Sequence, residues 1–254
     1  MTKKLHRVEI CFLGTAKAVP DKHHENTHFF IQVGDRNILV DCVGNPIVRL
    51  EQAGIDPLSI TDVILTHFHP DHVSGFPLLL MDLWLMGRET PLNVFGLEDV
   101  VDRAEKMMGL YDWHDWRNFY SVLFHPLPSN EKAILIDSEG VMVQASPLCH
   151  MIPSIGIRVT YQDIAIAYSS DTAPCEALVR LAEGVDLLIH EASGEGSGHS
   201  SPEQAAQIAE KAGVKKLVMI HYPPSIDHNE WVGKAQKFFS GEVSIAKDLE
   251  TISL

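Results

Sequence analysis

The pattern of apolar and polar positions predicts β-strands at residues 8–13, 28–33 and 37–41 of the chain. The last two segments flank Gly34-Asp35-Arg36, a turn-forming tripeptide that predicts a β-hairpin. Residues 62–66 form a β-branched run, which is typical of a strand buried on both faces. Apolar residues at helical spacing then alternate with strands through the rest of the first half. They predict helices at 46–53, 73–86 and 98–108 and a strand at 92–95.

The second half of the chain begins with a predicted β-meander that turns at Gln162-Asp163. Its predicted elements are strands at 141–145, 155–161, 164–168, 185–189 and 216–220 and a helix at 174–182. A further helix is expected to begin at Pro202, because Ser201 can cap it and Gln204 stands three residues after the cap. The mixed order of elements indicates an α/β protein.

Length and composition are those of an ordinary globular protein. The 254 residues are 45% hydrophobic and 21% charged, which argues against disorder, collagen-like repeats and coiled coil. Layered α/β architectures often reach this length undivided, so one domain over residues 1–254 is expected.

The net charge and the cysteines limit which partners and which cellular compartment are expected. The formal net charge of −14 argues against a duplex-binding module that depends on a basic surface. The four cysteines lie far apart with no Cys-x-x-Cys pair and no secretory leader, which favours the cytoplasm. The most apolar stretch, 76–86, contains Asp82 and is too short to span a membrane, which takes about 20 residues.

Histidines stand out, and they are densest in one hexapeptide. His67-Phe68-His69-Pro70-Asp71-His72 supplies three imidazoles and a carboxylate, a density that suits two adjacent metal ions better than a surface loop. The hexapeptide cannot complete the coordination of two ions, so further ligands are expected at later strand ends. The best-placed candidates are His150, Asp171 and His221. Four residues directly follow predicted strands, so folding could gather them on one rim of a sheet layer: His67, Asp171, His190 and His221. A structural role is nevertheless favoured for His190.

The hexapeptide, together with Leu13-Gly14-Thr15 after the first strand, resembles the metallo-β-lactamase fold, and within it the ribonuclease Z branch of tRNA 3′-processing endonucleases. The supporting matches are Gly87-Arg88, Pro91-Leu92, Phe95-Gly96, Pro153-Ser154, Gly156-Ile157-Arg158, Ser170-Asp171-Thr172, His190-Glu191-Ala192, Gly198-His199-Ser200 and Gln204-Ala205-Ala206. The resemblance covers the whole chain. It implies a four-layer αββα sandwich of two mixed β-sheets with outer helices.

The resemblance also implies a site for two divalent metal ions, zinc in the first place, with manganese or iron as alternatives. One ion is expected on His67, His69 and His150, and the other on Asp71, His72 and His221, with Asp171 and a water or hydroxide bridging them. Asp71 is expected to take the proton of that water. His199 is expected to protonate the leaving oxygen, and Glu191 to orient the His199 ring.

Departures from the ribonuclease Z pattern bear on the substrate. Lys22 matches the lysine of the loop after the first strand, but Glu25-Asn26 replaces its usual Arg-Asn pair. His150 and Asp171 are only 21 positions apart, which leaves no room for the long exosite arm that grips tRNA in many members. A metal-dependent hydrolase acting on a small phosphodiester is therefore predicted, with tRNA 3′ processing as the alternative.

Other readings stay open. Iron in the same fold would support redox chemistry, and loss of activity would leave a non-catalytic binding protein. Between residues 111 and 124 lie six aromatic residues, which favour a lid or a homodimer interface over a wall for stacking a base, while His114 and His125 in this stretch are not expected to bind metal. A homodimer is the predicted assembly, with no membrane partner.

Overall fold

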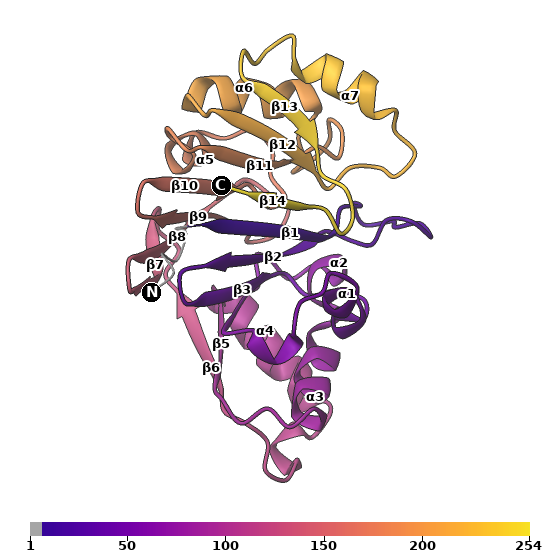
Figure 1. Ribbon diagram of the computed structural model, residues 1–254, viewed down its shortest axis with the longest axis vertical. Coiled ribbons are helices and arrows are strands. Elements are labelled where there is room, and N and C mark those ends of the chain that lie inside the picture. The colour runs from indigo at the N-terminus through magenta and orange to yellow at the C-terminus, as the bar shows by residue number, and fades with distance from the viewer. Residues whose placement is uncertain (1–6) are drawn as a thin grey trace, which may run out of the picture.

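The structure, a computed structural model describing residues 7–254, contains two seven-stranded β-sheets (Figure 1). The first sheet has the order β14-β1-β2-β3-β4-β5-β6. Its strands are β1 (Val8–Gly14), β2 (His28–Val33), β3 (Arg36–Val40), β4 (Asp62–Ile64), β5 (Leu92–Leu97), β6 (Val122–Leu127) and β14 (Thr251–Ser253). Pairing is antiparallel from β14 to β3 and parallel from β3 to β6, so the sheet is mixed.

The second sheet repeats this plan with the order β13-β12-β11-β10-β9-β8-β7. Its strands are β7 (Ala133–Ser138), β8 (Val141–Pro147), β9 (Ile155–Tyr161), β10 (Ile164–Tyr168), β11 (Leu187–Glu191), β12 (Lys216–Ile220) and β13 (Glu242–Ile245). The meander β8-β9-β10 is antiparallel as predicted, and β10 to β13 are parallel. The carboxyl ends of β10, β11 and β12 therefore meet at one edge, where ligands commonly bind.

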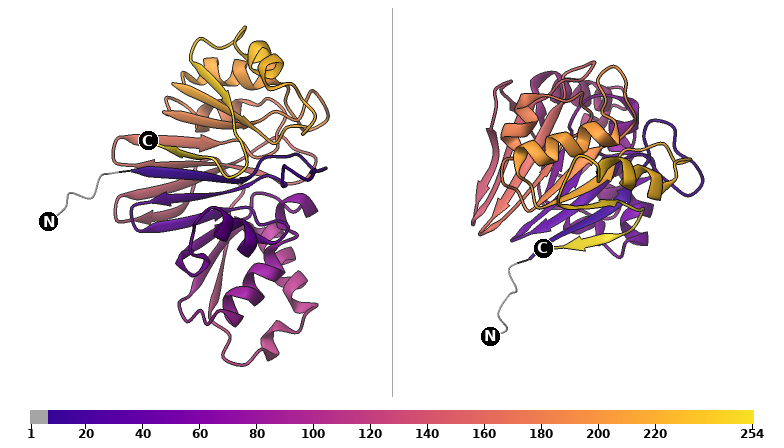
Figure 2. Two further views of the ribbon diagram at one scale, coloured as in Figure 1. Left: turned by 45° about the vertical axis from the view of Figure 1, so that its right-hand side comes forward. Right: turned by 90° about the horizontal axis from the view of Figure 1, so that it is seen from above.

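Helices cover the two outer faces (Figures 1 and 2). On one side lie α1 (Pro46–Gln52), α2 (Pro70–Val73), α3 (Phe76–Leu85) and α4 (Glu98–Gly109), and on the other α5 (Glu176–Leu181), α6 (Pro202–Ala212) and α7 (His228–Ala235). Short 3₁₀ helices occupy Pro57–Ser59 and Trp113–Asp115. The predicted αββα sandwich is confirmed. No helix among residues 7–254 has the length and apolar character needed to cross a membrane.

Apolar side chains of both sheets form one core between them. Phe29 of β2 and Tyr168 of β10 meet edge to face, with ring centroids 4.8 Å apart, and both are buried. A second core lies between β10–β12 and the helices α5–α7, around Leu188 and Leu217. Sheet-on-sheet packing thus holds the ends of β4 and β10 close together.

Two predicted elements differ from the structure in ways that shape the site. The predicted helix 73–86 is interrupted before α3, because Gly75 lies against the backbone of Val43, where a Cβ atom would meet the Val43 carbonyl carbon at 2.7 Å. The strand predicted at 185–189 lies two residues later, so His190 and Glu191 belong to β11 itself. The capping box of Ser201 and Gln204 on α6 is present as predicted.

Candidate metal centre

The hexapeptide begins three residues after Ile64, the last residue of β4, and its second half forms the start of α2. Its first two histidines, His67 and His69, lie in extended chain, and Pro70 starts the short helix that carries Asp71 and His72. Because extended and helical backbone succeed each other within six residues, the side chains face one space from two directions. His67 and His72 are fully buried, with ring centroids 4.0 Å apart.

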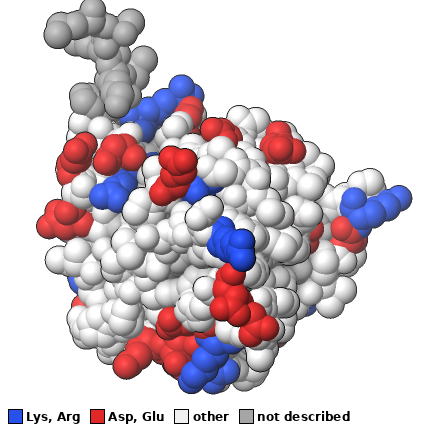
Figure 3. Space-filling view, turned by 90° about the horizontal axis from the view of Figure 1, so that it is seen from below, with Lys and Arg blue, Asp and Glu red and all other residues white. Residues whose placement is uncertain are grey.

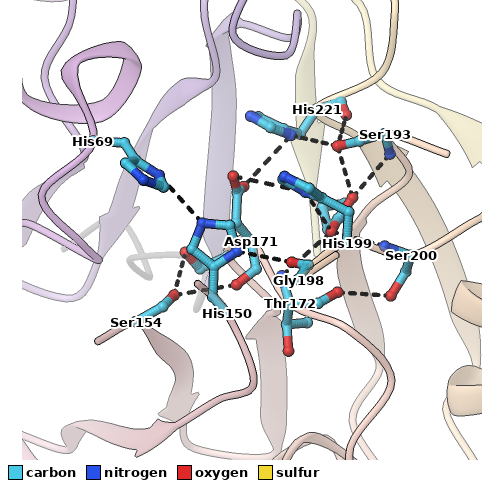
Figure 4. A network of polar contacts seen from close by, with 12 residues as sticks. His69, His150, Ser154, Asp171, Thr172, Ser193, Gly198, His199, Ser200 and His221 are labelled. Carbon is cyan, nitrogen blue, oxygen red and sulfur yellow. Dashed lines mark hydrogen bonds and ion pairs between the residues drawn. The ribbon is translucent and has the colours of Figure 1, made fainter. Parts of the chain in front are cut away.

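Three later segments bring the other predicted residues to the same place (Figure 4). His150 comes from the loop between β8 and β9, Asp171 follows β10, and His221 follows β12. Five groupings among residues 7–254 have donor atoms within 4.8 Å of one another. Three contain only the predicted ligands: His67, His69 and His150; His67, His72 and Asp171; and Asp71, His72 and His221. The other two include His199: His150, Asp171 and His199; and Glu191, His199 and His221. The structure therefore brings together the seven residues expected to bind metal.

Unpartnered buried atoms show that this cluster fits a cation. The Nε2 atoms of His67, His72 and His221 and the Oδ1 atom of Asp171 are buried without a hydrogen-bond partner among residues 7–254. Buried polar atoms are almost always hydrogen-bonded in proteins, and four exceptions in one cluster need a common explanation. Divalent metal ions bound by imidazole and carboxylate supply it.

Asp171 stands at the centre of the cluster. Its Oδ2 atom lies 3.8 Å from His67 Nε2 and 3.6 Å from His72 Nε2, and its Oδ1 atom lies 3.4 Å from His221 Nδ1. Burial opposes ionisation of this carboxyl, but His221 and His72 hold its pKa well below the ordinary value. Burial lowers the pKa of His67, which favours the neutral imidazole that binds metal.

A second set of contacts orients the imidazoles. The Nδ1 atom of His150 lies 2.8 Å from the Gly198 carbonyl oxygen, and Ser193 Oγ lies 2.8 Å from His221 Nδ1. Asp41, which was not predicted as a site residue, contacts His72 Nδ1 at 2.8 Å and accepts the backbone N–H of Thr66. Such contacts fix which ring nitrogen faces the metal.

The backbone is strained at this edge of the sheets. Asp41, Ser170 and His221 have φ values of 59°, 49° and 54°, in the left-handed region that non-glycine residues seldom adopt. A strained backbone conformation persists only where the surrounding structure holds it in place. Here the support comes from the buried strand that each residue follows. The strained turns aim three polar side chains back toward the space between the sheets.

Replacing Asp41 with asparagine is expected to weaken metal binding by about 10- to 100-fold, because His72 loses the carboxylate that holds its ring. Competition with a coloured chelator measures the affinity. Asp35→Asn, an equal charge change at the exposed other end of β3, is the matched control. Equal affinities of the two variants would show that Asp41 does not position His72.

His199 lies beside the cluster (Figure 4) and pairs with Glu191. His199 Nδ1 lies 3.1 Å from Glu191 Oε1, and its ring is 5.0 Å from that of His150. The hydrogen bond that His199 donates to Glu191 raises the pKa of His199, so the ring keeps its proton to higher pH. Buried Glu191 also accepts the backbone N–H groups of Ser193 and Ser200. The pair has the form of a histidine acid held by a carboxylate.

These groups open into a pocket of about 500 Å³. Beyond the metal cluster, the pocket is lined by Lys17, Val19, Met151, residues 193–196 and His199. Lys17 was not predicted as a site residue, and the sequence offered only its place shortly after the first strand as a signal. Lys22, matched by resemblance to a family lysine, is exposed and does not line this pocket.

The remaining predicted residues lie elsewhere. His190 is buried in β11, with Nδ1 2.7 Å from the Glu191 carbonyl oxygen, and belongs to none of the potential metal groups among residues 7–254. His125 contacts Asn93, 3.0 Å away, outside the cluster. The aromatic segment 111–124 packs on itself and on Trp84, which stacks on Trp116 at 5.1 Å. None of its residues lines the metal pocket of the described chain.

Comparisons with known proteins agree with this geometry. The family model of the beta-lactamase superfamily domain matches residues 36–222. A ribonuclease Z of Methanothermobacter thermautotrophicus is 28% identical, with 97% of each chain covered.

Solved structures give the same picture. The metallo-beta-lactamase fold protein YhfI from Bacillus subtilis has a TM-score of 0.85 at 21% identity, over 98% of this chain and 100% of that one. The short form of human tRNase Z has a TM-score of 0.78 at 26% identity, over 96% and 98%. In each comparison the likeness extends over nearly the full length of both chains.

Proposed function

The chain belongs to the β-lactamase superfamily, among the metal-dependent hydrolases of its ribonuclease Z-like branch, and from this premise we propose that it hydrolyses a small phosphodiester. The observation that carries the proposal is the cluster of seven histidine and aspartate side chains beside the His199–Glu191 pair. A site of this kind combines charge stabilisation with a proton donor, which is what cleavage of a phosphodiester with a poor leaving group requires.

The proposed ligands form two sets. His67, His69 and His150 would hold one ion, and Asp71, His72 and His221 the other, with Asp171 touching both. Zinc is proposed because neutral imidazole and carboxylate suit it, while manganese and iron are distinguished by elemental analysis of the purified protein. Two such cations, when bound, lower the pKa of water and neutralise charge developing on a phosphoryl group.

The chain's own residues supply the proton transfers. Asp71 lines the pocket and is only partly buried, which suits a carboxylate that accepts a proton from the attacking water. His199 reaches the same pocket with a raised pKa and donates a proton to the leaving oxygen. Glu191 keeps the His199 ring in place.

Two features favour a small substrate over a whole tRNA, namely the short segment between two proposed ligands and the net charge. Most of the chain between His150 and Asp171 forms the β9–β10 hairpin, so no long arm projects there. The net charge is −14. On the face seen in Figure 3, basic side chains alternate with acidic ones and form no continuous patch. Phosphate backbones are held chiefly by clustered Lys and Arg, and a chain with 20 Lys and Arg against 34 Asp and Glu is poorly suited to that.

The metal-loaded protein is expected to cleave bis(p-nitrophenyl) phosphate with a higher kcat/KM than a precursor tRNA. Both substrates should be assayed with one preparation at low and at physiological salt, because added ions screen weak phosphate contacts. Removal of tRNA 3′ trailers with a far higher kcat/KM would contradict the proposal. It would favour tRNA 3′ processing instead, the candidate supported by the ribonuclease Z and tRNase Z names of full-length relatives.

We also propose a cytoplasmic homodimer. The four cysteines are free thiols, as expected in a reducing compartment. Large apolar side chains are exposed near the ends of α3 and α4, namely Leu85, Leu110 and Tyr111, at 67%, 84% and 56%.

Leu110→Asp is expected to convert the dimer to a monomer, because it places a charge in the proposed interface. Sedimentation velocity measures the change, and Leu123→Asp on the exposed side of β6 is the control. A wild-type protein that stays monomeric at all concentrations would contradict the assembly.

A further inference from the structure

Resting on the proposed function, we infer that the pocket selects a compact diester with one negative charge and an apolar or aromatic ester arm. Lys17 contacts the phosphate, Val19 and Met151 bind the arm, and Glu195 disfavours a second phosphate. All four residues line the metal pocket. None of them belongs to a proposed ligand set, so they can set specificity without holding the metal ions.

The backbone of Lys17 is fixed with respect to the metal cluster. Its N–H donates to the carbonyl oxygen of Tyr222, the residue after His221, at 3.1 Å. Its carbonyl oxygen accepts the side-chain amide of Asn26 at 2.8 Å. The Lys17 side chain therefore starts from an anchored position beside a proposed metal ligand.

The ammonium of Lys17 is available for a substrate anion. No carboxylate among residues 7–254 forms an ion pair with it, whereas other lysines such as Lys211 and Lys215 are paired. Lys17 and His199 line the same pocket. An ammonium placed there can contact a non-bridging phosphate oxygen while His199 faces the leaving oxygen.

Two apolar side chains stand at the mouth of the pocket where a polar rim would be expected. Val19 is 73% exposed and Met151 is 60% exposed, and both line the pocket. Their positions are tied to the site, because Val19 follows Lys17 by two residues and Met151 follows the proposed ligand His150. Exposed apolar surface beside a polar centre is typical of a binding subsite for an apolar group.

Glu195 limits the charge that the pocket accepts. It is exposed, it lines the pocket, and no cation in the described part of the chain pairs with it. A substrate with a second phosphate beyond the scissile one would meet this carboxylate at the rim. Repulsion between like charges therefore favours a mono-anionic diester over an oligonucleotide.

Binding of unreactive anions separates this inference from catalysis. Diphenylphosphinate and dimethylphosphinate carry one negative charge and no cleavable ester, and calorimetry with the metal-loaded protein measures their affinities. Lys17→Ala is expected to weaken both by about tenfold, because it removes a charged hydrogen bond. Lys22→Ala, on the same loop but outside the pocket, is the matched control and should change neither.

The apolar subsite is tested by the double variant Val19→Ser with Met151→Ser. It should lower the affinity for diphenylphosphinate by about fivefold and leave the affinity for dimethylphosphinate unchanged. Only the phenyl rings are large enough to contact Val19 and Met151. Val48→Ser, at an exposed position of α1 outside the pocket, is the control. Equal losses for both phosphinates would overturn the subsite.

The role of Glu195 is tested with thymidine 5′-(4-nitrophenyl phosphate) and its 3′-phosphorylated derivative, which share a leaving group. Wild type is expected to cleave the first compound with the higher kcat/KM. Glu195→Gln should reduce the ratio of the two kcat/KM values by about threefold. No preference in wild type would overturn this part.

Failure of the inference and failure of the proposed function have different signatures. Wild type that hydrolyses diesters while Lys17→Ala and Lys22→Ala bind phosphinates equally well overturns the inference alone. If wild type hydrolyses no diester but binds phosphinates in a Lys17-dependent way, the proposed reaction is wrong and the proposed anion site is supported. Absence of phosphinate binding to the metal-loaded wild type overturns the inference whatever the activity.

Discussion

Asp171→Asn is expected to lower kcat/KM for a phosphodiester by about 10³-fold or more and to reduce the metal content of the protein. The carboxylate lies within 3.8 Å of ring nitrogens of His67, His72 and His221, which belong to both proposed ligand sets. Its loss removes one negative charge from between two proposed cations. Metal ions contribute several kcal/mol of transition-state stabilisation, and each 1.36 kcal/mol corresponds to about tenfold in rate.

Elemental analysis and kinetics on the same preparation measure both effects. Asp163→Asn, an identical chemical change at the opposite, exposed end of β10, should retain wild-type metal content and activity. The metal-free forms of both variants should keep wild-type circular dichroism, which shows that folding is intact. Two bound metals and full activity in Asp171→Asn would refute its assignment as a shared ligand.

His199→Ala is expected to leave metal content unchanged and to slow hydrolysis by about 10²-fold or more when the leaving group is an alcohol. The loss should be much smaller for p-nitrophenolate, which departs without being protonated. His114→Ala, at an exposed position outside the cluster, is the control. Equal losses for both leaving groups would contradict a role as general acid, and a loss of metal would make His199 a ligand.

The pH profile gives a second test of the same residue. The hydrogen bond that His199 donates to Glu191 raises the pKa of His199, so the protonated acid persists at a pH above its ordinary range. Glu191→Gln weakens that effect. The alkaline limb of the plot of kcat/KM against pH, for substrates with alcohol leaving groups, should therefore move to lower pH. If the limb does not move, a group other than His199 titrates in it.

The predicted strands that match the structure are those whose signal is local and strong. The hairpin of β2 and β3 and the meander from β8 to β10 are apolar runs bounded by turn residues, and their pairing follows from short connections. The four strands missing from the prediction are β6, β7, β13 and β14, and each is an edge strand. Edge strands are short or half-exposed, as at Ile134, so the hydropathy pattern hardly marks them.

The sequence by itself determined much of the metal cluster. Three histidines and an aspartate lie within six residues, so no fold can carry them far apart, and this local density made the family resemblance recognisable. Their places after predicted strands then pointed to His150, Asp171 and His221, and the resemblance assigned them to two ions; their grouping with the hexapeptide is seen in the structure.

Only the tertiary structure placed Asp41 and Lys17 at the site. Asp41 contacts His72, 31 positions away, and Lys17 is anchored to Tyr222 from the other sheet's edge. Neither residue carries a local signal, since an aspartate after a strand is commonly a turn residue and a loop lysine is commonly solvated. Their places at the site depend on contacts between segments that meet only when the chain folds, and such contacts leave no periodicity in the sequence.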